Sequence, residues 1–135
     1  MLQTGWMVPM TDDSGLTPRV DVDGELSAED AKLVTLARGA RARIGADEGA
    51  AVRDETGRTY SGATVHLGRL ELSALELAVA QAAASGAKGL EAAVVVRRDA
   101  GLVDDDISVV RSLAGTGALV YVVLPDSTVA SRSTT

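Results

Sequence analysis

The chain has 135 residues, a formal net charge of -6, no cysteine and a single histidine, His66. This length suits one compact domain rather than two. Without cysteine there is no disulfide framework, thiol nucleophile, iron–sulfur cluster or cysteine-ligated zinc site, and a histidine-based zinc site needs about three protein ligands. Acidic residues outnumber basic ones by 19 to 13, so we do not expect the basic face of a nucleic-acid-binding protein.

Residues 1–25 mix Gly, Pro, Thr and Asp without helical or strand periodicity, and residues 127–135 are rich in Ser and Thr. We expect both segments to be flexible tails on either side of a domain over 26–126. Trp6 is interpreted as an exposed residue of the first tail or as an anchor onto a neighbouring subunit. The first ten residues lack the positive stretch of a secretory signal, and no apolar run approaches the ~20 residues of a membrane span. The expected location is the cytoplasm.

A first helix is predicted between Ser27 and Gly45. Ser27 offers the hydroxyl of an N-cap, and Asp30 offers a carboxylate three residues on, as in a capping box. Apolar residues then recur at helical spacing until the glycine, which can end the helix: Leu33, Leu36, Ala37, Ala40 and Ile44.

A β-hairpin is predicted next. The segments 49–53 and 59–65 flank Asp54-Glu-Thr-Gly57, whose glycine can adopt a positive φ. A second helix then begins at Ser73, because Ser73 and Glu76 have the spacing of a capping box. This Ala-rich helix is expected to end at Ser85-Gly86.

The remaining chain predicts a strand, a helix and a strand. The segments 90–96 and 118–124 are continuously apolar, as in strands covered on both faces. Between them a helix is expected from Asp104-Asp-Asp106 to Gly115. The order α-β-β-α-β-α-β implies a mixed sheet with helices on both faces, which is an α/β protein built as a three-layer α/β/α sandwich.

This order, together with particular residues, resembles the cytidine deaminase family over roughly residues 33–124. The hairpin is similar to that family's pattern V-G-A-A-(x)-x-x-x-D-G-x-x-Y-x-G, with Thr56 in place of the Asp. Three other segments carry the resemblance: Ala37–Arg43 is similar to the Ala/Arg-rich opening helix, Ala80–Gly86 to the end of the second helix, and Val94–Val96 to the central strand.

The residues that carry the family's chemistry are replaced in this chain. In the family, the second helix begins C/H-A-E, where the first residue ligates zinc and the Glu moves protons between the metal-bound water and the pyrimidine. Counting back from the shared Ser-Gly, Ser73 falls at the ligand position and Leu75 at the glutamate. The resemblance therefore implies a site without its first ligand and without its acid/base.

The two other motifs of the family are replaced as well. The family's P-C-x-x-C supplies two further zinc ligands, and Asp106 and Val109 stand at the positions of its thiolates. The family's N-x-E grips the ribose, and it corresponds here to Thr64 and His66. We therefore expect no metal and no cofactor.

Other chemistry at these residues has a structural alternative in each case. Glu76 as an acid/base, through a one-residue slip, competes with its use in the capping box. Ser73 as a nucleophile needs a base, and His66 is the only imidazole. The acidic run 104–106 offers oxygen ligands for Mg²⁺ or Ca²⁺, but it equally complements the macrodipole of the following helix.

The sequence thus predicts a cytidine deaminase-like domain that has lost zinc and catalysis and that binds a partner protein or copies of itself. The resemblance implies a homo-oligomer, a dimer or a tetramer. A mean hydropathy of +0.14 in a small chain with polar ends agrees with this. The alternatives are a divergent nucleoside deaminase or hydrolase, using Glu76 or the run 104–106, and a small-ligand sensor that keeps the cleft without chemistry.

Overall fold

The computed structural model describes residues 26–101 and 103–135, so Trp6 and the tail predicted over 1–25 lie outside the described residues. Five strands form one sheet in the order β2-β1-β5-β6-β7, while β3 and β4 form a separate two-stranded hairpin, which we call the arm (65–72). The elements are, in chain order, α1 (Ala28–Ile44), β1 (Gly49–Asp54), β2 (Thr59–Ala63), β3 (Val65–Leu67), β4 (Leu70–Leu72), α2 (Ala74–Ala84), β5 (Leu90–Val96), α3 (Val103–Ala114), β6 (Leu119–Val123) and β7 (Val129–Thr134).

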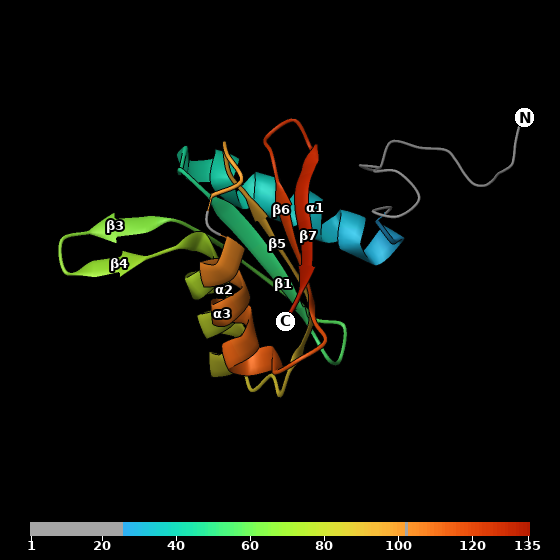
Figure 1. Cartoon of the computed structure of the whole chain (residues 1–135). Helices are drawn as coiled ribbons and strands as arrows, with labels where there is room; N and C mark the ends of the chain where they lie inside the picture. The colour runs from blue at the N-terminus through green and yellow to red at the C-terminus, as the bar shows by residue number, and fades with distance from the viewer. Residues whose placement is uncertain (1–25, 102) are drawn as a thin grey trace, which may run out of the picture.

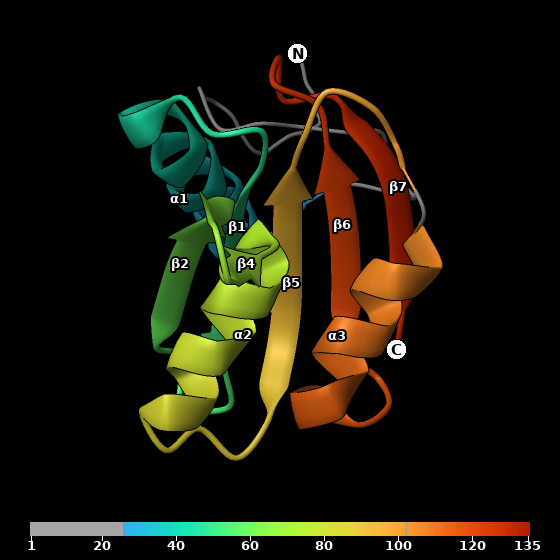
Figure 2. The same ribbon diagram turned by 90° about the vertical axis from the view of Figure 1, so that its left-hand side faces the viewer.

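The five-stranded sheet is mixed and has helices on both faces. β5 and β6 run parallel, whereas the other neighbouring strands run antiparallel. α1 packs on one face, and α2 and α3 pack on the other, as Figures 1 and 2 show. The predicted three-layer α/β/α sandwich is confirmed.

The two central strands explain how one sheet serves two cores. Successive side chains of a strand point to opposite faces. Val94 of β5 therefore packs in the cluster under α1, and Val95 packs in the cluster under α2 and α3. In β6, Tyr121 and Val122 divide in the same way. The continuous apolar sequence of both strands follows from this double burial.

Two glycines allow the helices to approach the sheet closely. A Cβ atom built on Gly49 of β1 would lie 2.1 Å from the carbonyl oxygen of Ala37 in α1. A Cβ atom on Gly62 of β2 would lie 2.9 Å from the carbonyl oxygen of Ala74 in α2. Both distances are too short for any side chain, so each helix rests directly on the backbone of its strand.

The starts of α1 and α2 differ, although the sequence predicts the same motif at both. At α2, Ser73 Oγ accepts from Glu76 N (3.0 Å) and the Glu76 carboxylate accepts from Ser73 N (2.8 Å), which completes the predicted capping box. At α1, Ser27 Oγ accepts from Asp30 N (3.0 Å). The Asp30 carboxylate is instead buried and accepts from the Tyr121 hydroxyl (2.7 Å).

No helix within the described ranges has the length and apolarity to cross a membrane.

Two parts of the fold differ from the prediction. The arm forms at residues 65–72, where no further strands were expected, and β7 forms at Val129–Thr134, within the predicted flexible tail over 127–135. That tail prediction was wrong, because the segment pairs antiparallel with β6 as an edge strand. The sequence of β7 is mostly small and polar, so it has no hydrophobic pattern that would predict a strand. The strand is held instead by backbone hydrogen bonds to β6.

Candidate functional site

The candidate site lies where the carboxyl end of β5 meets the first turns of α2 and α3. Two adjoining hollows of about 370 and 530 Å³ open there, and Glu48, Ser73 and Glu76 line both of them. The smaller hollow extends along the base of the arm, past Thr64 and His66. The larger one extends over the first turn of α3. In open α/β sheets, ligands bind outside the carboxyl ends of the strands, which makes these hollows the candidate site.

Ser73 and Glu76 stand at the rim of both hollows, but each is already engaged. The Ser73 hydroxyl and the Glu76 carboxylate bind each other's backbone N–H groups in the capping box. No imidazole contacts Ser73 in the described part of the chain, since His66 lies on the arm, exposed and 3.7 Å from Glu71. Ser73 therefore lacks the base that a nucleophilic serine needs.

Leu75 does not line either hollow. Its side chain is 1% exposed and packs in the cluster between α2 and the sheet, with Val79 and Val52 among its members. This burial follows from the spacing of the helix, because Leu75 and Val79 are one turn apart and share the face that meets the sheet. An aliphatic side chain thus occupies the position that the resemblance assigns to the acid/base.

Asp106 forms a buried ion pair with Arg97, which follows β5 directly. Arg97 Nη1 donates to Asp106 Oδ1 (3.1 Å) and Nη2 donates to Oδ2 (2.8 Å), a bidentate arrangement. Arg97 Nε also donates to the carbonyl oxygen of Asp99 (3.1 Å), and Nη2 donates to that of Ala100. Burial lowers the pKa of Arg97, but Asp106 and Glu48 outweigh it and raise the pKa above its usual value. The guanidinium stays charged and fixed.

The pKa of Glu48, at the border of both hollows, is raised by its surroundings. Desolvation raises its pKa above the ordinary value, Arg97 at 3.7 Å lowers it, and the nearby carboxylate of Asp106 raises it again, with a net upward shift. Thr64 holds the backbone of Glu48, since Thr64 Oγ1 accepts from Glu48 N (3.0 Å). Thr64 thus positions the backbone of Glu48, and both residues line the smaller hollow.

The larger hollow also contains Val109, which is half-buried and packs against the core under α3. The structure therefore brings Ser73, Glu76, Asp106 and Val109 to one hollow, and it places Thr64 and His66 around the adjoining one. Leu75 is separated from both.

Comparison with known proteins decides the family. The sequence model of the family described as "Cytidine deaminase-like" matches residues 26–127. The chain belongs to the cytidine deaminase-like family. The resemblance that the sequence indicated is thereby confirmed. Among curated protein sequences, none matches this chain.

Solved structures of cytidine deaminases share the fold of this cytidine deaminase-like chain. The enzyme from Burkholderia pseudomallei superposes with a TM-score of 0.67 at 20% identity, covering 80% of this chain and 92% of that chain. The enzyme from Mycobacterium leprae gives 0.61 at 18% identity, covering 80% and 94%. The enzyme from Mycobacterium tuberculosis gives 0.57 at 23% identity, covering 70% and 85%. At these identities the likeness concerns the fold.

The donor set of this cytidine deaminase-like chain does not fit the zinc ion that the family implies. Among residues 26–101 and 103–135, no three His, Cys, Asp or Glu side chains gather in a group that could hold a metal. The resemblance assigns three positions to ligands. Ser73 is the N-cap of α2, the Val109 side chain has no atom that can bind a metal, and the Asp106 carboxylate is bound by the guanidinium of Arg97. The run 104–106 does not form such a group either, since the Asp106 carboxylate is bound by Arg97 while Asp104 and Asp105 are exposed on the first turn of α3.

Sequence reasoning missed Arg97 and Glu48, which define the charge of the site. Arg97 carries a usable signal, since a charged residue at the end of a buried strand lies at the edge where sites form. Glu48 precedes β1 on the other side of the site, and its approach to Arg97 depends on the pairing of β1 with β5. No local pattern in the sequence indicates that distance.

Proposed function

We propose that this chain is a cytoplasmic, non-catalytic member of the cytidine deaminase-like family that acts by associating with copies of itself or with a partner protein. One observation carries the loss of zinc and catalysis: the guanidinium of Arg97 is bound bidentately to Asp106, the one carboxylate at an assigned ligand position. A guanidinium remains protonated throughout the physiological range. A divalent cation at Asp106 would have to displace or oppose that fixed positive charge.

The residues at the position of the family's acid/base glutamate also support the loss of catalysis. Leu75 is buried at the position of the family's glutamate, and the carboxylate of Glu76, one residue on, caps the helix. A proton shuttle has to reach both a bound water and the substrate. Leu75 has no carboxylate, and one carboxylate oxygen of Glu76 is held by the Ser73 N–H.

A second candidate function is the binding of a small ligand without chemistry. The larger hollow, of about 530 Å³, is open and bordered by polar side chains rather than filled by an apolar plug. This volume lies within the range of small-molecule sites, about 300–1,000 Å³. Thr64 and His66 in place of the family's ribose-binding motif argue against a nucleoside held in the family's way.

Ammonia release from cytidine and deoxycytidine, measured with the full chain after incubation with zinc, tests the proposal. We expect no release above the rate without protein. Release that is saturable in cytidine and abolished by a chelator would show a divergent deaminase and overturn the proposal. A thermal-shift screen with nucleosides addresses the second candidate, since a ligand at ~100 times its Kd stabilises the folded state by about 2.7 kcal/mol.

A further inference from the structure

The arm is amphipathic, with one aliphatic face and one polar face. Its register sets Val65 opposite Leu72 and Leu67 opposite Leu70. Directly opposed residues of an antiparallel pair share a face, and alternate residues along a strand share it too. These four side chains therefore form what we call the aliphatic face of the arm.

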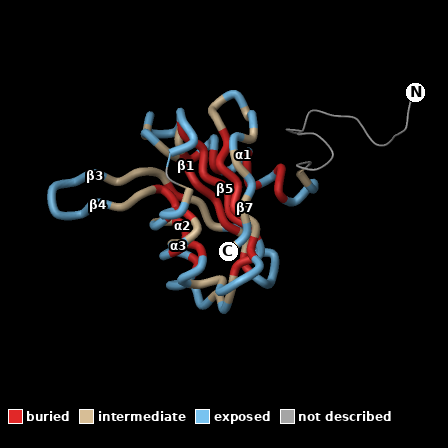
Figure 3. Tube along the Cα trace, viewed as in Figure 1, coloured by how far each residue is buried: buried red, intermediate tan, exposed pale blue. Residues whose placement is uncertain are grey.

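The outer half of this aliphatic face lies in water. Leu67 is 67% exposed and Leu70 is 54% exposed, and Figure 3 shows the exposed end of the arm projecting beyond the body. The arm adjoins the rest of the described chain where β4 runs next to α2. A lone two-stranded hairpin is at best marginally stable in water. The arm therefore has a face that another surface would cover.

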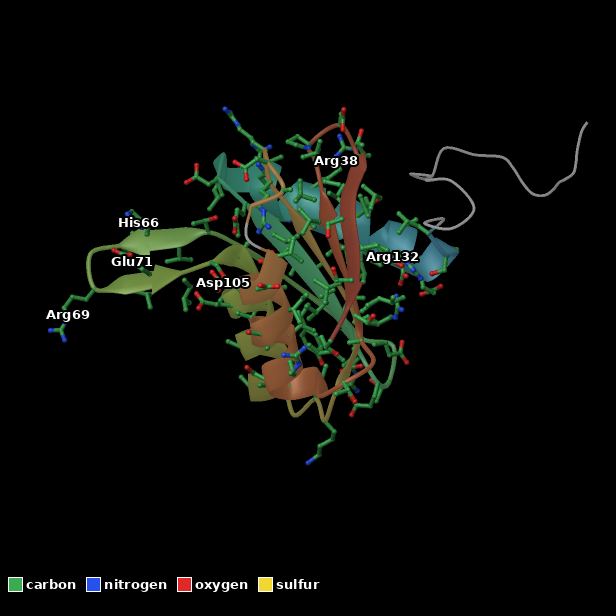
Figure 4. The ribbon with its side chains drawn as sticks, viewed as in Figure 1. Arg38, His66, Arg69, Glu71, Asp105 and Arg132 are labelled. Atoms are coloured by element: carbon green, nitrogen blue, oxygen red, sulfur yellow. The ribbon has the colours of Figure 1, made fainter. Side chains whose placement is uncertain are left out.

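The charges of the arm favour a second copy of the same arm as that surface. Arg69 sits at the tip, points away from the body in Figure 4, and forms no ion pair with any residue of the described ranges. The base is acidic, since Asp47, Glu48 and Glu76 line the hollow beside it. A second arm that runs antiparallel brings each cationic tip to the acidic base of the other. A parallel arrangement would instead set Arg69 against Arg69.

We propose that two copies of this chain associate through their arms, aliphatic face against aliphatic face and antiparallel, around a two-fold axis. The inference rests on the self-association in the proposed function and names the surface that performs it. A two-fold axis uses the same patch on both subunits, which requires a self-complementary patch, and an aliphatic face with a basic tip and an acidic base meets that requirement.

The arms alone are small compared with the ~1,200 Å² that a stable interface buries. α2, which begins at the base of the arm, offers further apolar surface. Its exposed surface includes Ala80, Ala83 and Ala84 beside the polar Glu76 and Gln81. Exposed alanines add apolar area that a second copy can cover. We expect the interface to continue from the arm onto this helix.

Sedimentation velocity of the full chain over a range of concentrations tests the arm. We expect a dimer for the wild type and a monomer for Leu67→Ser/Leu70→Ser, with the dissociation constant of the dimer raised at least about 100-fold because two central apolar side chains are lost. Leu36→Ser is the matched control, since Leu36 is an exposed leucine (39%) on α1, away from the arm. This variant is expected to remain a dimer. Circular dichroism establishes that each variant is folded.

The charge arrangement has its own test. Arg69→Glu should weaken the dimer about tenfold, whereas Arg69→Lys should leave it nearly unchanged. An Arg69→Glu dimer as stable as the wild type overturns the antiparallel arrangement.

The outcomes separate this inference from the proposed function. If the Leu67→Ser/Leu70→Ser variant remains a dimer, the arm is not the interface, and self-association occurs through another surface. If the Leu36→Ser control also becomes a monomer, the effect is not specific to the arm and the inference is overturned. A wild-type monomer at every concentration overturns the arm and self-association together, while the loss of zinc and catalysis is tested separately by ammonia release.

Discussion

Each face of the sheet has an arginine–aspartate pair that joins the sheet, or the residue directly after a strand, to a helix, and the two pairs have different surroundings. On the α1 face, Arg53 Nη2 lies 2.9 Å from Asp30 Oδ1, and the Tyr121 hydroxyl donates to the same carboxylate. On the other face, Arg97 binds Asp106 bidentately at the border of the open hollow. The first pair lies over a closed core, and the second borders the open hollow that contains the positions assigned by the resemblance. The comparison teaches that one type of interaction joins a helix to the sheet over a closed core on one face and beside an open hollow on the other.

Removing Asp30 is expected to have the largest effect. Asp30→Ala leaves the Tyr121 hydroxyl without its partner and removes the buried carboxylate of Arg53, which then keeps only the exposed Glu91 at 2.8 Å. Breaking a buried pair costs about 3–5 kcal/mol. Urea unfolding measures this loss. Glu29→Ala is the matched control, because Glu29 is exposed and its pair with Lys32 (3.4 Å) lies at the surface, where such pairs contribute ~0–1 kcal/mol.

Removing Asp106 is expected to cost less, about 2–3 kcal/mol, because no tyrosine hydroxyl loses its partner there and the pair with Arg97 borders the open hollow. Glu48 lies 3.7 Å from the same guanidinium and can close on it. The exposed neighbour Asp105→Ala serves as control. If Asp106→Ala destabilised the chain as much as Asp30→Ala, the two pairs would be equivalent and the distinction drawn here would fail.

Tyr121→Phe tests how much the Tyr121 hydroxyl contributes to the pair on the α1 face. It removes one hydrogen bond to Asp30 and keeps the packing of the ring, so the expected loss is about 1–1.5 kcal/mol. Burial, followed by the bond to Asp30, raises the pKa of Tyr121. The absorbance of tyrosinate should therefore develop at higher pH in the folded chain than in the unfolded chain, and its development at the ordinary pKa would contradict this contact.

The pH dependence of Glu48 is expected to be the smallest effect. Because its pKa is raised in the folded state, mainly by desolvation, the folded chain binds the proton more tightly than the unfolded chain does. Stability from this group is present below the unfolded pKa of about 4.5 and is lost as pH rises through the folded value. Glu48→Gln should remove this decline. A wild type that gained stability relative to Glu48→Gln over the same range would show the opposite shift.

The sequence alone was sufficient for most of the fold because its signals are local. The Ser73 capping box, the turn at 54–57 and the apolar strands each depend on residues close together in the chain, and each is found in the structure. The arm and β7 escaped prediction because three-residue strands and a Ser/Thr-rich edge strand leave too short or too polar a pattern.

The site was predictable in its positions but not in its interactions. Counting back from the shared Ser-Gly singled out Ser73, and the start of the third predicted helix singled out Asp106; both line the same hollow. The partner of Asp106 is nine residues away across a loop, and Asp30 binds Arg53 of β1 and also Tyr121, which is ninety-one residues away. Asp30 was interpreted as a capping residue because the local motif is the only one visible in sequence. Long-range pairs of this kind depend on the sheet.

The account's central claim is that Arg97, bound to Asp106, stands where a zinc ion would need its ligands, and metal analysis of the purified full chain after incubation with zinc tests it most directly. We predict less than about a tenth of an equivalent of zinc per chain, because structural and catalytic zinc sites need three or four protein ligands. One equivalent of tightly bound zinc would contradict the account.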